Sequence, residues 1–376
     1  MRVLHINNER TWRGGERQTL LTALEQRRQG VDARLACRRG SPLEGAAQAE
    51  GLPVLALSTS VPAVLLTLAR AARSFDVLHC HTGRAHSLGL LATLPGRKPM
   101  VVSRRTDFPP PRSWFNRWKY GRAEQVVCVC QQVAKVLRAW GLPPAKISVI
   151  YEAVPGHAYL PREECRKQLR QRGGVPADKK IVGNIAALVP DKDQATLLRA
   201  AQAVTAQRPD AVFVLVGDGE LKGQLTRLRD QLGLASKVYF TGFVQEAQRL
   251  MPGFDLFAVS SSHEGFCTVI LDAALADVPV AATAGGGIPE NVLHEQTGLL
   301  VPVGDAAALG RALLRLLEEP DLGARLARAA KERIQRDFSV ASMARKYVEV
   351  YESILGARGS APGAKARPLE GTRRNL

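Results

Sequence analysis

The feature that most constrains this chain is a regular alternation of short apolar runs with helix-length segments, which starts at the first residues. Apolar runs of this length, separated by helical patterns, predict βαβ units and therefore parallel sheets covered by helices. Helices are expected at Glu16–Gln29 and Gln131–Trp140, among others. The strands predicted in the first half are Val3–Ile6, Ala33–Ala36, Val54–Leu57, Val77–Cys80, Met100–Ser103, Val126–Val129 and Ile147–Ile150.

The same alternation begins again after a polar stretch near 156–178. Two helical segments, at about 321–336 and 340–355, close the pattern, and Ser339 is suited to cap the second one. The strands predicted in this half are Ile181–Ile185, Val212–Val216, Val238–Phe240, Leu256–Val259, Val280–Ala282 and Leu299–Val301. The helices predicted between them are at about 192–207, 219–232, 266–276 and 305–318.

We therefore predict an α/β fold with two doubly wound, Rossmann-like domains that face each other across a cleft. Such sheets bind ligands beyond the carboxyl ends of their strands, so the cleft is the expected ligand site. The predicted units are a first domain at 1–155, a second domain at 156–338, a helix at 339–356 that packs back on the first domain, and a disordered basic tail at 357–376.

The chain carries a net charge of +17, and its basic residues are unevenly distributed. Residues 1–150 hold 23 Lys and Arg against 9 Asp and Glu, an excess of 14, whereas residues 151–356 hold 24 against 25. A one-sided excess predicts an anionic partner, such as a phosphorylated acceptor, an anionic lipid or a nucleic acid. The alternative is a basic surface that is merely solvated.

The sequence carries no recognisable export or membrane-insertion signal. Residues 1–9 contain no apolar core of a signal peptide, and no run of 18 apolar residues occurs. We therefore expect a cytoplasmic protein, and the basic first domain leaves peripheral attachment to the inner face of the cytoplasmic membrane open. The cysteines are scattered through apolar runs without metal or redox spacing, so we expect small buried core residues. They are Cys37, Cys80, Cys128, Cys130, Cys165 and Cys267.

The most informative stretch is 260–274, which follows a predicted strand and opens a helix. The first N–H groups of a helix are unpaired and suit a phosphate, and Gly265 permits a close backbone approach. Asp272 lies eight residues after Glu264, about two helical turns, so both carboxylates are expected near one face. Such carboxylates can accept hydrogen bonds from sugar hydroxyls; the alternative is acids that complement the helix dipole.

These residues fit the pattern E-G-F-x4-L-[D/E]-A, which resembles the signature of glycosyltransferase family 4, retaining enzymes of the two-domain GT-B fold. The segments around it agree in order: 215–219 resembles the family's V-G-D-G turn, 285–290 its G-G-x-P-E turn and 297–302 its G-L-L-V-P strand. The resemblance covers about residues 1–355 and implies that the first domain binds the acceptor and the second the donor nucleotide sugar.

The resemblance carries roles to individual residues of the second domain. Glu264 would lie beside the donor sugar as a catalytic residue, and Asp272 would hold the donor ribose. The backbone at Phe266, Cys267 and Thr268 would face the diphosphate. Lys192 matches the lysine of the family's donor-phosphate motif, whose arginine is replaced here by Ala187.

Further residues are expected around the donor and the reacting centre. The loop with Gly14 and Gly15 resembles the family's G-G-x-E loop beside the diphosphate. Gly217, in a tight turn, and Phe243, after the strand 238–240, are also predicted to contact the donor. Arginine stands where many relatives have a catalytic histidine, so Arg105 is a predicted catalytic residue, with Arg104 as the alternative cation.

His81 ends the preceding strand and is predicted either to line the cleft as a catalytic residue or to be a buried, hydrogen-bonded histidine. No D-x-D motif stands at a strand end, and the groups that handle charge are cationic or backbone, so we predict no metal and no cofactor. The segment 112–122 mixes aromatic with basic residues. It suits a membrane interface or a single-stranded nucleic acid, or it is a core helix with solvated charges.

Together these features predict a retaining, metal-independent glycosyltransferase. It would move a hexose-type sugar from a nucleotide-diphosphate sugar to a cell-envelope acceptor, such as lipopolysaccharide core or a lipid-linked saccharide. An anionic inner-membrane surface is an expected partner and nucleic acid is not. The alternatives are a GT-B-fold nucleotide-sugar epimerase or phosphorylase, or a non-enzymatic basic protein that binds a membrane or a nucleic acid.

Overall fold

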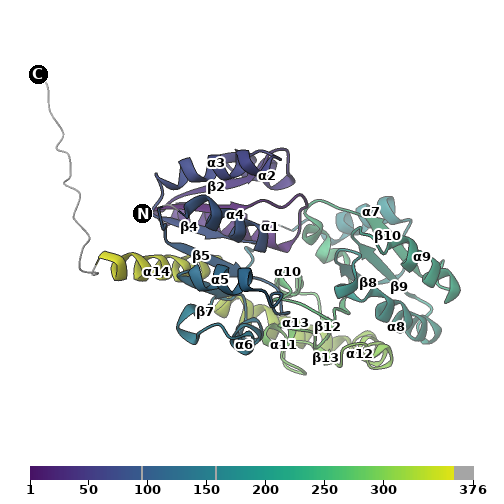
Figure 1. Ribbon diagram of the computed structural model, residues 1–376. Helices are drawn as coiled ribbons and strands as arrows, with labels where there is room; N and C mark the ends of the chain where they lie inside the picture. The colour runs from purple at the N-terminus through teal and green to yellow at the C-terminus, as the bar shows by residue number, and fades with distance from the viewer. Residues whose placement is uncertain (95, 157–158, 360–376) are drawn as a thin grey trace, which may run out of the picture.

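The computed structural model describes residues 1–94, 96–156 and 159–359, and it holds two separate parallel sheets with helices packed against them (Figure 1). The first sheet has seven strands in the order β3-β2-β1-β4-β5-β6-β7. Its strands are β1 (Arg2–Asn7), β2 (Asp32–Arg38), β3 (Val54–Leu57), β4 (Val77–Cys80), β5 (Met100–Arg104), β6 (Gln125–Cys128) and β7 (Ile147–Val149). Every strand predicted for this half is present.

The strand order of the first sheet determines which helices share a face. From β1 to β3 the chain steps in one direction, and from β3 to β7 it returns in the other. Because crossovers between parallel strands are right-handed, the helices of the two runs lie on opposite faces. One face has α1 (Gly14–Arg28) and α2 (Pro42–Ala49); the other has α3 (Val61–Ala72), α4 (Gly83–Thr93), α5 (Trp114–Arg122) and α6 (Gln131–Trp140).

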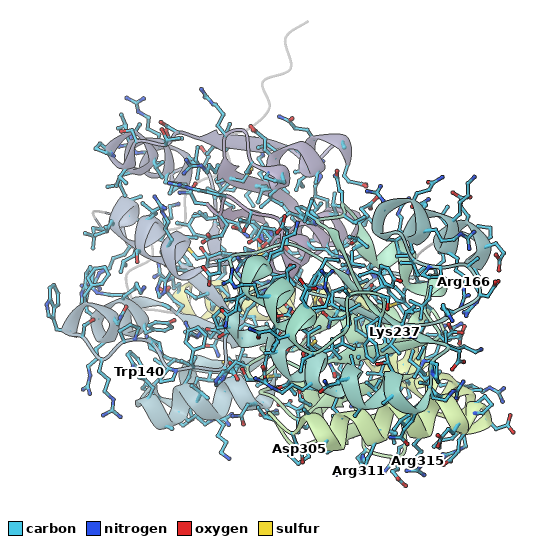
Figure 2. The ribbon with its side chains drawn as sticks, turned by 90° about the vertical axis from the view of Figure 1, so that its right-hand side faces the viewer. Trp140, Arg166, Lys237, Asp305, Arg311 and Arg315 are labelled. Atoms are coloured by element: carbon cyan, nitrogen blue, oxygen red, sulfur yellow. The ribbon has the colours of Figure 1, made fainter. Side chains whose placement is uncertain are left out.

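The second sheet has six parallel strands in the order β10-β9-β8-β11-β12-β13. Arg311 and Arg315 of α12 (Ala306–Glu318), a helix packed on this sheet, lie at the outer edge of the domain (Figure 2). The strands are β8 (Lys180–Ile185), β9 (Ala211–Val216), β10 (Val238–Gly242), β11 (Leu256–Val259), β12 (Val280–Thr283) and β13 (Leu299–Val301). The helices are α7 (Arg162–Gly173), α8 (Gln194–Gln207), α9 (Lys222–Gln231), α10 (Thr268–Leu275), α11 (Ile288–Asn291), α12 (Ala306–Glu318) and α13 (Pro320–Asp337).

Two elements differ from the sequence prediction. The stretch 156–178, expected only to be polar, contains α7, which packs on the short 3-10 segment Ala247–Gly253. Most of its residues are charged or polar, and it buries only Cys165 and Leu169, one turn apart, so its apolar pattern is too weak to detect. The last helix, α14 (Val340–Gly359), runs three residues into the predicted tail, and the rest of that tail lies outside the described residues.

The helix α14 returns to the first domain. It packs along α1, and its buried Tyr347 and Tyr351 side chains contact Ser103 of β5 and His79 of β4. Ser339 caps it, since the Ser342 amide donates to the Ser339 hydroxyl at 3.1 Å, as predicted. The apolar core of the first domain also includes Phe266 and Phe338 from the second half of the chain, so the two domains share a packed seam.

All six cysteines are buried and unbridged, as the sequence predicts. In the described part of the chain, no helix combines the length and the apolar character that crossing a bilayer requires.

Gly183 of β8 should tolerate no side chain. A Cβ built there would lie 2.4 Å from the ring of Phe254, which is 1% exposed. We expect Gly183→Ala to lower the free energy of unfolding by about 1–3 kcal/mol through overpacking. Gly45→Ala is the matched control, because Gly45 lies exposed in α2 with no atom near its Cβ position. It should stabilise by about 0.5–1 kcal/mol through helix propensity. Thermal unfolding measures both effects, and unfolding temperatures that shift in the same direction in the two variants would contradict this packing.

Candidate active site

The loop 260–267 leaves β11 at its carboxyl end and is tied to the segment that holds Lys192. The Ser262 amide donates to the Asp191 carbonyl at 2.9 Å, and the Ser260 hydroxyl donates to the Lys192 carbonyl at 2.9 Å. Lys192 lies in the 3-10 turn Pro190–Lys192 rather than in α8, which begins two residues later. These bonds hold the lysine beside the loop although 68 or more residues separate them along the chain.

Lys192 and Glu264 form an ion pair, with 2.5 Å between Nζ and Oε1. The Ser261 hydroxyl donates to the same oxygen at 2.8 Å, so the carboxylate is held in one orientation. Burial by itself disfavours the charged lysine, but the neighbouring Glu264 carboxylate outweighs it and raises the pKa of Lys192. The predicted pair of charged groups is therefore assembled, with a cation fixed in a site that is only partly open to water.

Gly265 has a different close neighbour from the one expected. A Cβ at Gly265 would lie 2.1 Å from the Arg105 carbonyl oxygen of the first domain. The Cys130 thiol, also from the first domain, donates to the Gly265 carbonyl at 2.9 Å. This glycine therefore lets the two domains touch, whereas the sequence suggested an approach to phosphate.

The N-termini of two helices face each other across the interface. The Cβ position of Gly14, the first residue of α1, lies 3.7 Å from the Thr268 hydroxyl, at the first residue of α10. No side chain caps the first amides of α10, whereas at the start of α1 the Glu16 carboxylate accepts from the Arg13 amide at 2.9 Å. Cys267, which precedes α10, adopts a left-handed conformation with φ of 56°. The positive ends of two helix dipoles thus lie next to each other at the domain interface, an arrangement that suits an anion.

Arg105 lies beside the start of α1 and is held by two neighbours. Its Nε donates to Glu152 at 2.6 Å, and its guanidinium contacts the His81 carbonyl and the His81 Nδ1 at 3.1 and 3.2 Å. Its side chain lies 3.6 Å from the Cβ position of Gly15. Burial raises the pKa of Glu152, and the Arg105 charge counteracts this only in part. Three predicted residues, Arg105, His81 and Gly15, are therefore neighbours.

Asp272 is bound by a residue that the sequence did not reveal. Arg17 of α1 forms a bidentate pair with the Asp272 carboxylate, at 2.6 and 2.9 Å, and the carboxylate is 1% exposed. The two residues are 255 positions apart, and no local pattern links them. That Asp272 holds a ribose stays a prediction, and any ligand hydroxyl would have to share or displace the Arg17 guanidinium.

The remaining residues predicted to bind the donor differ in how far they are exposed to solvent. Phe266 is buried against the rings of Tyr151 and Phe338, so it can contribute only backbone to a ligand. The Cβ position of Gly217 lies 1.9 Å from the Ala186 carbonyl, so this glycine permits the tight turn beside Ala187. Phe243 stands apart, 57% exposed on the loop after β10.

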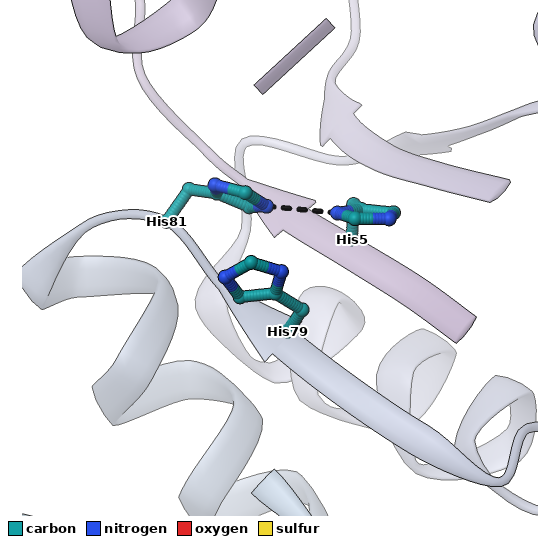
Figure 3. Close-up of side chains that lie close together, drawn as sticks. All are labelled: His5, His79 and His81. Atoms are coloured by element: carbon teal, nitrogen blue, oxygen red, sulfur yellow. Dashed lines mark hydrogen bonds between the residues drawn. The ribbon is translucent and has the colours of Figure 1, made fainter. Parts of the chain in front are cut away.

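His5, His79 and His81 form a buried cluster at the ends of β1 and β4 (Figure 3). Among the described residues their nitrogens are close enough to hold a metal ion together. However, all six ring nitrogens already contact a protein partner: His5 with His81 and Gln26, His79 with Ser103 and Tyr351, and His81 with Arg105. The nearby guanidinium also repels a second cation. The cluster is therefore a hydrogen-bond network, and His81 is the buried, bonded histidine of the two predicted alternatives.

Two more contacts between the domains were missed by the sequence. The Glu290 carboxylate accepts from the Gln131 and Gln132 amides at the N-terminus of α6, at 2.8 and 2.7 Å. Asp107 of the first domain contacts the His263 ring at 3.1 Å. Glu290 belongs to the recognised G-G-x-P-E turn, so its position was visible in the sequence, but its partner was not.

Comparisons with known proteins agree with this geometry. Residues 12–155 match the family model Glycosyltransferase Family 4, and residues 166–333 match the model Glycosyl transferases group 1. The lipopolysaccharide core biosynthesis glycosyltransferase LpsD of Rhizobium meliloti (strain 1021) is 29% identical over 368 residues, which cover 95% of this chain and 100% of the relative. The N-acetyl-alpha-D-glucosaminyl L-malate synthase of Bacillus anthracis is 25% identical over 291 residues, 75% of this chain and 76% of that protein.

A crystal structure of Anabaena Alr3699/HepE in complex with UDP and glucose superposes with a TM-score of 0.84 at 24% identity, and covers 94% of this chain and 100% of that one. The predicted fold of two facing Rossmann-like domains is thereby confirmed.

The buried Arg17–Asp272 pair should couple the two domains energetically. We expect Arg17→Ala to cost about 3–5 kcal/mol of unfolding free energy, because it leaves a buried carboxylate without its cation. Arg17→Ala combined with Asp272→Ala should cost clearly less than the two single changes together. The exposed pair Arg34–Asp32 is the control, and its cycle should give at most about 1 kcal/mol. Strictly additive costs at positions 17 and 272 in denaturant unfolding would contradict the coupling.

The histidine cluster should make stability fall in mild acid. Burial lowers the pKa of His5 to about 4 and lowers the pKa values of His79 and His81 well below the ordinary value. Below pH 6.5 these histidines therefore bind protons in the unfolded chain but not in the folded protein. The free energy of unfolding should fall by about 1.4 kcal/mol per pH unit for each such histidine. Urea unfolding at pH 7, 6 and 5 measures this slope, and His5→Gln should make it shallower; equal stability at pH 7 and 5 would refute it.

Proposed function

This chain belongs to glycosyltransferase family 4, and on that premise we propose that it moves a hexose from a UDP-sugar to an acceptor of the cell envelope. The reaction would retain the anomeric configuration and need no metal ion. Family membership makes the chain a glycosyltransferase that uses a nucleotide sugar, and so excludes the non-enzymatic alternative. The donor, the acceptor and the stereochemistry are the proposed part.

The observation that carries the proposal is the convergence of positive groups between the domains. When the bond from the sugar to the diphosphate breaks, negative charge accumulates on the phosphate oxygens, and fixed donors stabilise it. The N-termini of α1 and α10 supply amides and positive dipole ends, and Lys192 supplies a charge that Glu264 and Ser261 hold in place. These groups need no reorganisation during the reaction, which supports metal-independent stabilisation.

Two arginines from the first domain can replace the arginine that is missing at Ala187. Arg105 lies beside Gly15 at the start of α1, and Arg17 reaches α10 from the first turn of the same helix. Both lie within electrostatic range of Glu152, since both lower its pKa against the effect of burial. We infer that the cationic side of the diphosphate site is built from both domains and forms fully when they meet.

Glu264 has the position to bind the transferred sugar. It lies between the lysine and the first turn of α10, and its carboxylate can accept hydrogen bonds from sugar hydroxyls. No protein side chain is assigned as general base in this proposal. The leaving phosphate would take the proton of the acceptor hydroxyl, which is consistent with retention on one face of the sugar.

The envelope acceptor is proposed from two observations. The relative LpsD, which this chain spans completely, is a lipopolysaccharide core biosynthesis enzyme. The first domain carries an excess of 14 positive charges, which suits a phosphorylated or lipid-linked saccharide. HepE has been seen with UDP-glucose, so UDP-glucose is the first donor to test. We place the enzyme in the cytoplasm, where nucleotide sugars are made.

Removing either member of the Lys192–Glu264 pair should abolish most of the activity. We expect Lys192→Met and Glu264→Gln each to lower kcat/KM for release of UDP from UDP-glucose by about 10²–10³. Lys222→Met is the control, because Lys222 is an exposed lysine of α9, far along the chain from the loop. Thermal unfolding of each variant separates lost chemistry from lost structure. Turnover at the level of the parent protein in both variants would remove the site assignment.

A calorimetric panel of UDP-, ADP- and GDP-glucose identifies the donor. We expect binding of one of these by the full chain, undiminished by EDTA. NMR of the product reports the anomeric configuration, and an inverted product or a conversion without acceptor would overturn the proposed reaction.

A further inference from the structure

The face of the first domain made by α3, α4 and α5 carries basic but no acidic residues on its helices. These three helices contain no Asp or Glu, whereas α1 and α2 on the opposite face contain Glu16, Glu25 and Glu44. From 58 to 123 the chain has 11 Lys and Arg and only two acids. Of these acids, Asp76 pairs with Arg2, and Asp107 is nearly buried beside His263.

The three helices form one continuous surface. α4 packs against α3 on one side and against α5 on the other, and they follow one another down the first domain in Figure 1. We call this surface, formed by residues 61–73, 83–94 and 112–122, the basic helical face.

Each helix presents the same pattern to solvent, with a large apolar residue and an arginine on its outer stripe. On α3, Leu66 is 53% exposed and Arg70 follows it by one turn. On α4 and just beyond its end, exposed Arg84 is followed on the same stripe by Leu91 and Leu94, which are 38% and 45% exposed.

The outer stripe of α5 begins with Trp114, which is 79% exposed, and continues with exposed Arg117. The buried side of this helix is formed by Lys119 and Tyr120. Of the three predictions for 112–122, the core helix with solvated charges describes only the inner side, where Tyr120 is buried and Trp118 packs against the core, because Trp114 lies in water on the outer side.

We propose that the basic helical face binds the surface of an anionic lipid bilayer. Exposed leucine, valine and tryptophan on helices that also carry arginines suit the boundary between headgroups and acyl chains, where both parts are satisfied. Aliphatic side chains offer no stacking surface to bases, so single-stranded nucleic acid is a poorer fit. Without carboxylates on these helices, nothing on the face repels acidic lipid headgroups.

The position of this face relative to the site supports the assignment. Arg105, whose guanidinium contacts His81 in the site, is separated by only two residues from Phe108, which is 47% exposed. The same loop then leads to Trp114 at the start of α5. A bilayer that contacts Phe108 and Trp114 would thus lie at the mouth of the interdomain site, within reach of an acceptor embedded in lipid.

The test is flotation of the full chain with vesicles, without any nucleotide sugar. One set contains phosphatidylcholine alone and the other contains phosphatidylcholine with phosphatidylglycerol. We expect binding to the anionic vesicles only, weakened by salt. Arg84→Glu combined with Arg117→Glu should reduce partitioning by about tenfold or more, because each charge near the surface contributes to attraction. Trp114→Ser should reduce it through the apolar contribution.

The matched control reverses two exposed arginines on the second domain, Arg227→Glu with Arg311→Glu, which changes the net charge equally (Figure 2 labels Arg311). Loss of vesicle binding in the variant with Arg84→Glu and Arg117→Glu, but not in the control, supports binding through the basic helical face. Equal loss in both double variants, equal binding to both vesicle types, or binding to a single-stranded oligonucleotide with none to vesicles would overturn the proposal.

UDP-glucose calorimetry on the same variants is an independent measurement. Unchanged binding of UDP-glucose together with lost flotation supports docking through this face. Absent binding of UDP-glucose together with intact flotation counts against the proposed function alone.

Discussion

The ion pair between Arg17 and Asp272 is the interaction on which the candidate site most depends. It joins the first turn of α1 to the middle of α10, and it is almost completely removed from water. A buried pair of this kind is sensitive to geometry, since separating the partners leaves an uncompensated charge in a poor solvent. It therefore favours the arrangement in which the two helix N-termini face each other, and the proposed diphosphate site depends on that arrangement.

Other contacts between the two domains also hold them together. Glu290 caps α6 of the first domain, and Cys130 of that domain donates to the Gly265 carbonyl. Phe266 and Phe338 extend the apolar core of the first domain into the second. The loop 260–267 thus contributes to two features. Its Glu264 carboxylate pairs with Lys192 in the candidate site, and its Gly265 and Phe266 contact the first domain. A change in this loop affects chemistry and domain contact at once.

The histidine network connects the last helix with the reacting region. Tyr351 of α14 contacts His79 at 2.6 Å, and His5 links through His81 to Arg105. Because these rings are neutral in the folded protein, the network orients Arg105 without adding positive charge beside it. The charge of the first domain is instead carried on its outer helices and beside the second domain, so the proposed anionic surface and the proposed donor would each be attracted to a separate region.

The sequence alone determined the two sheets and the positions of the motifs, because strand and helix periods and short signatures are local properties. All thirteen strands lie where the apolar runs predicted them, and Lys192 and Glu264 meet as the resemblance implies. Only the tertiary structure decided which distant charges pair, as Arg17 with Asp272 and Arg105 with Glu152, since no periodicity encodes contacts between separate domains. It also decided that α7 is a helix and that the acid-free helices α3, α4 and α5 form one surface. Both depend on packing partners that a one-dimensional pattern does not contain.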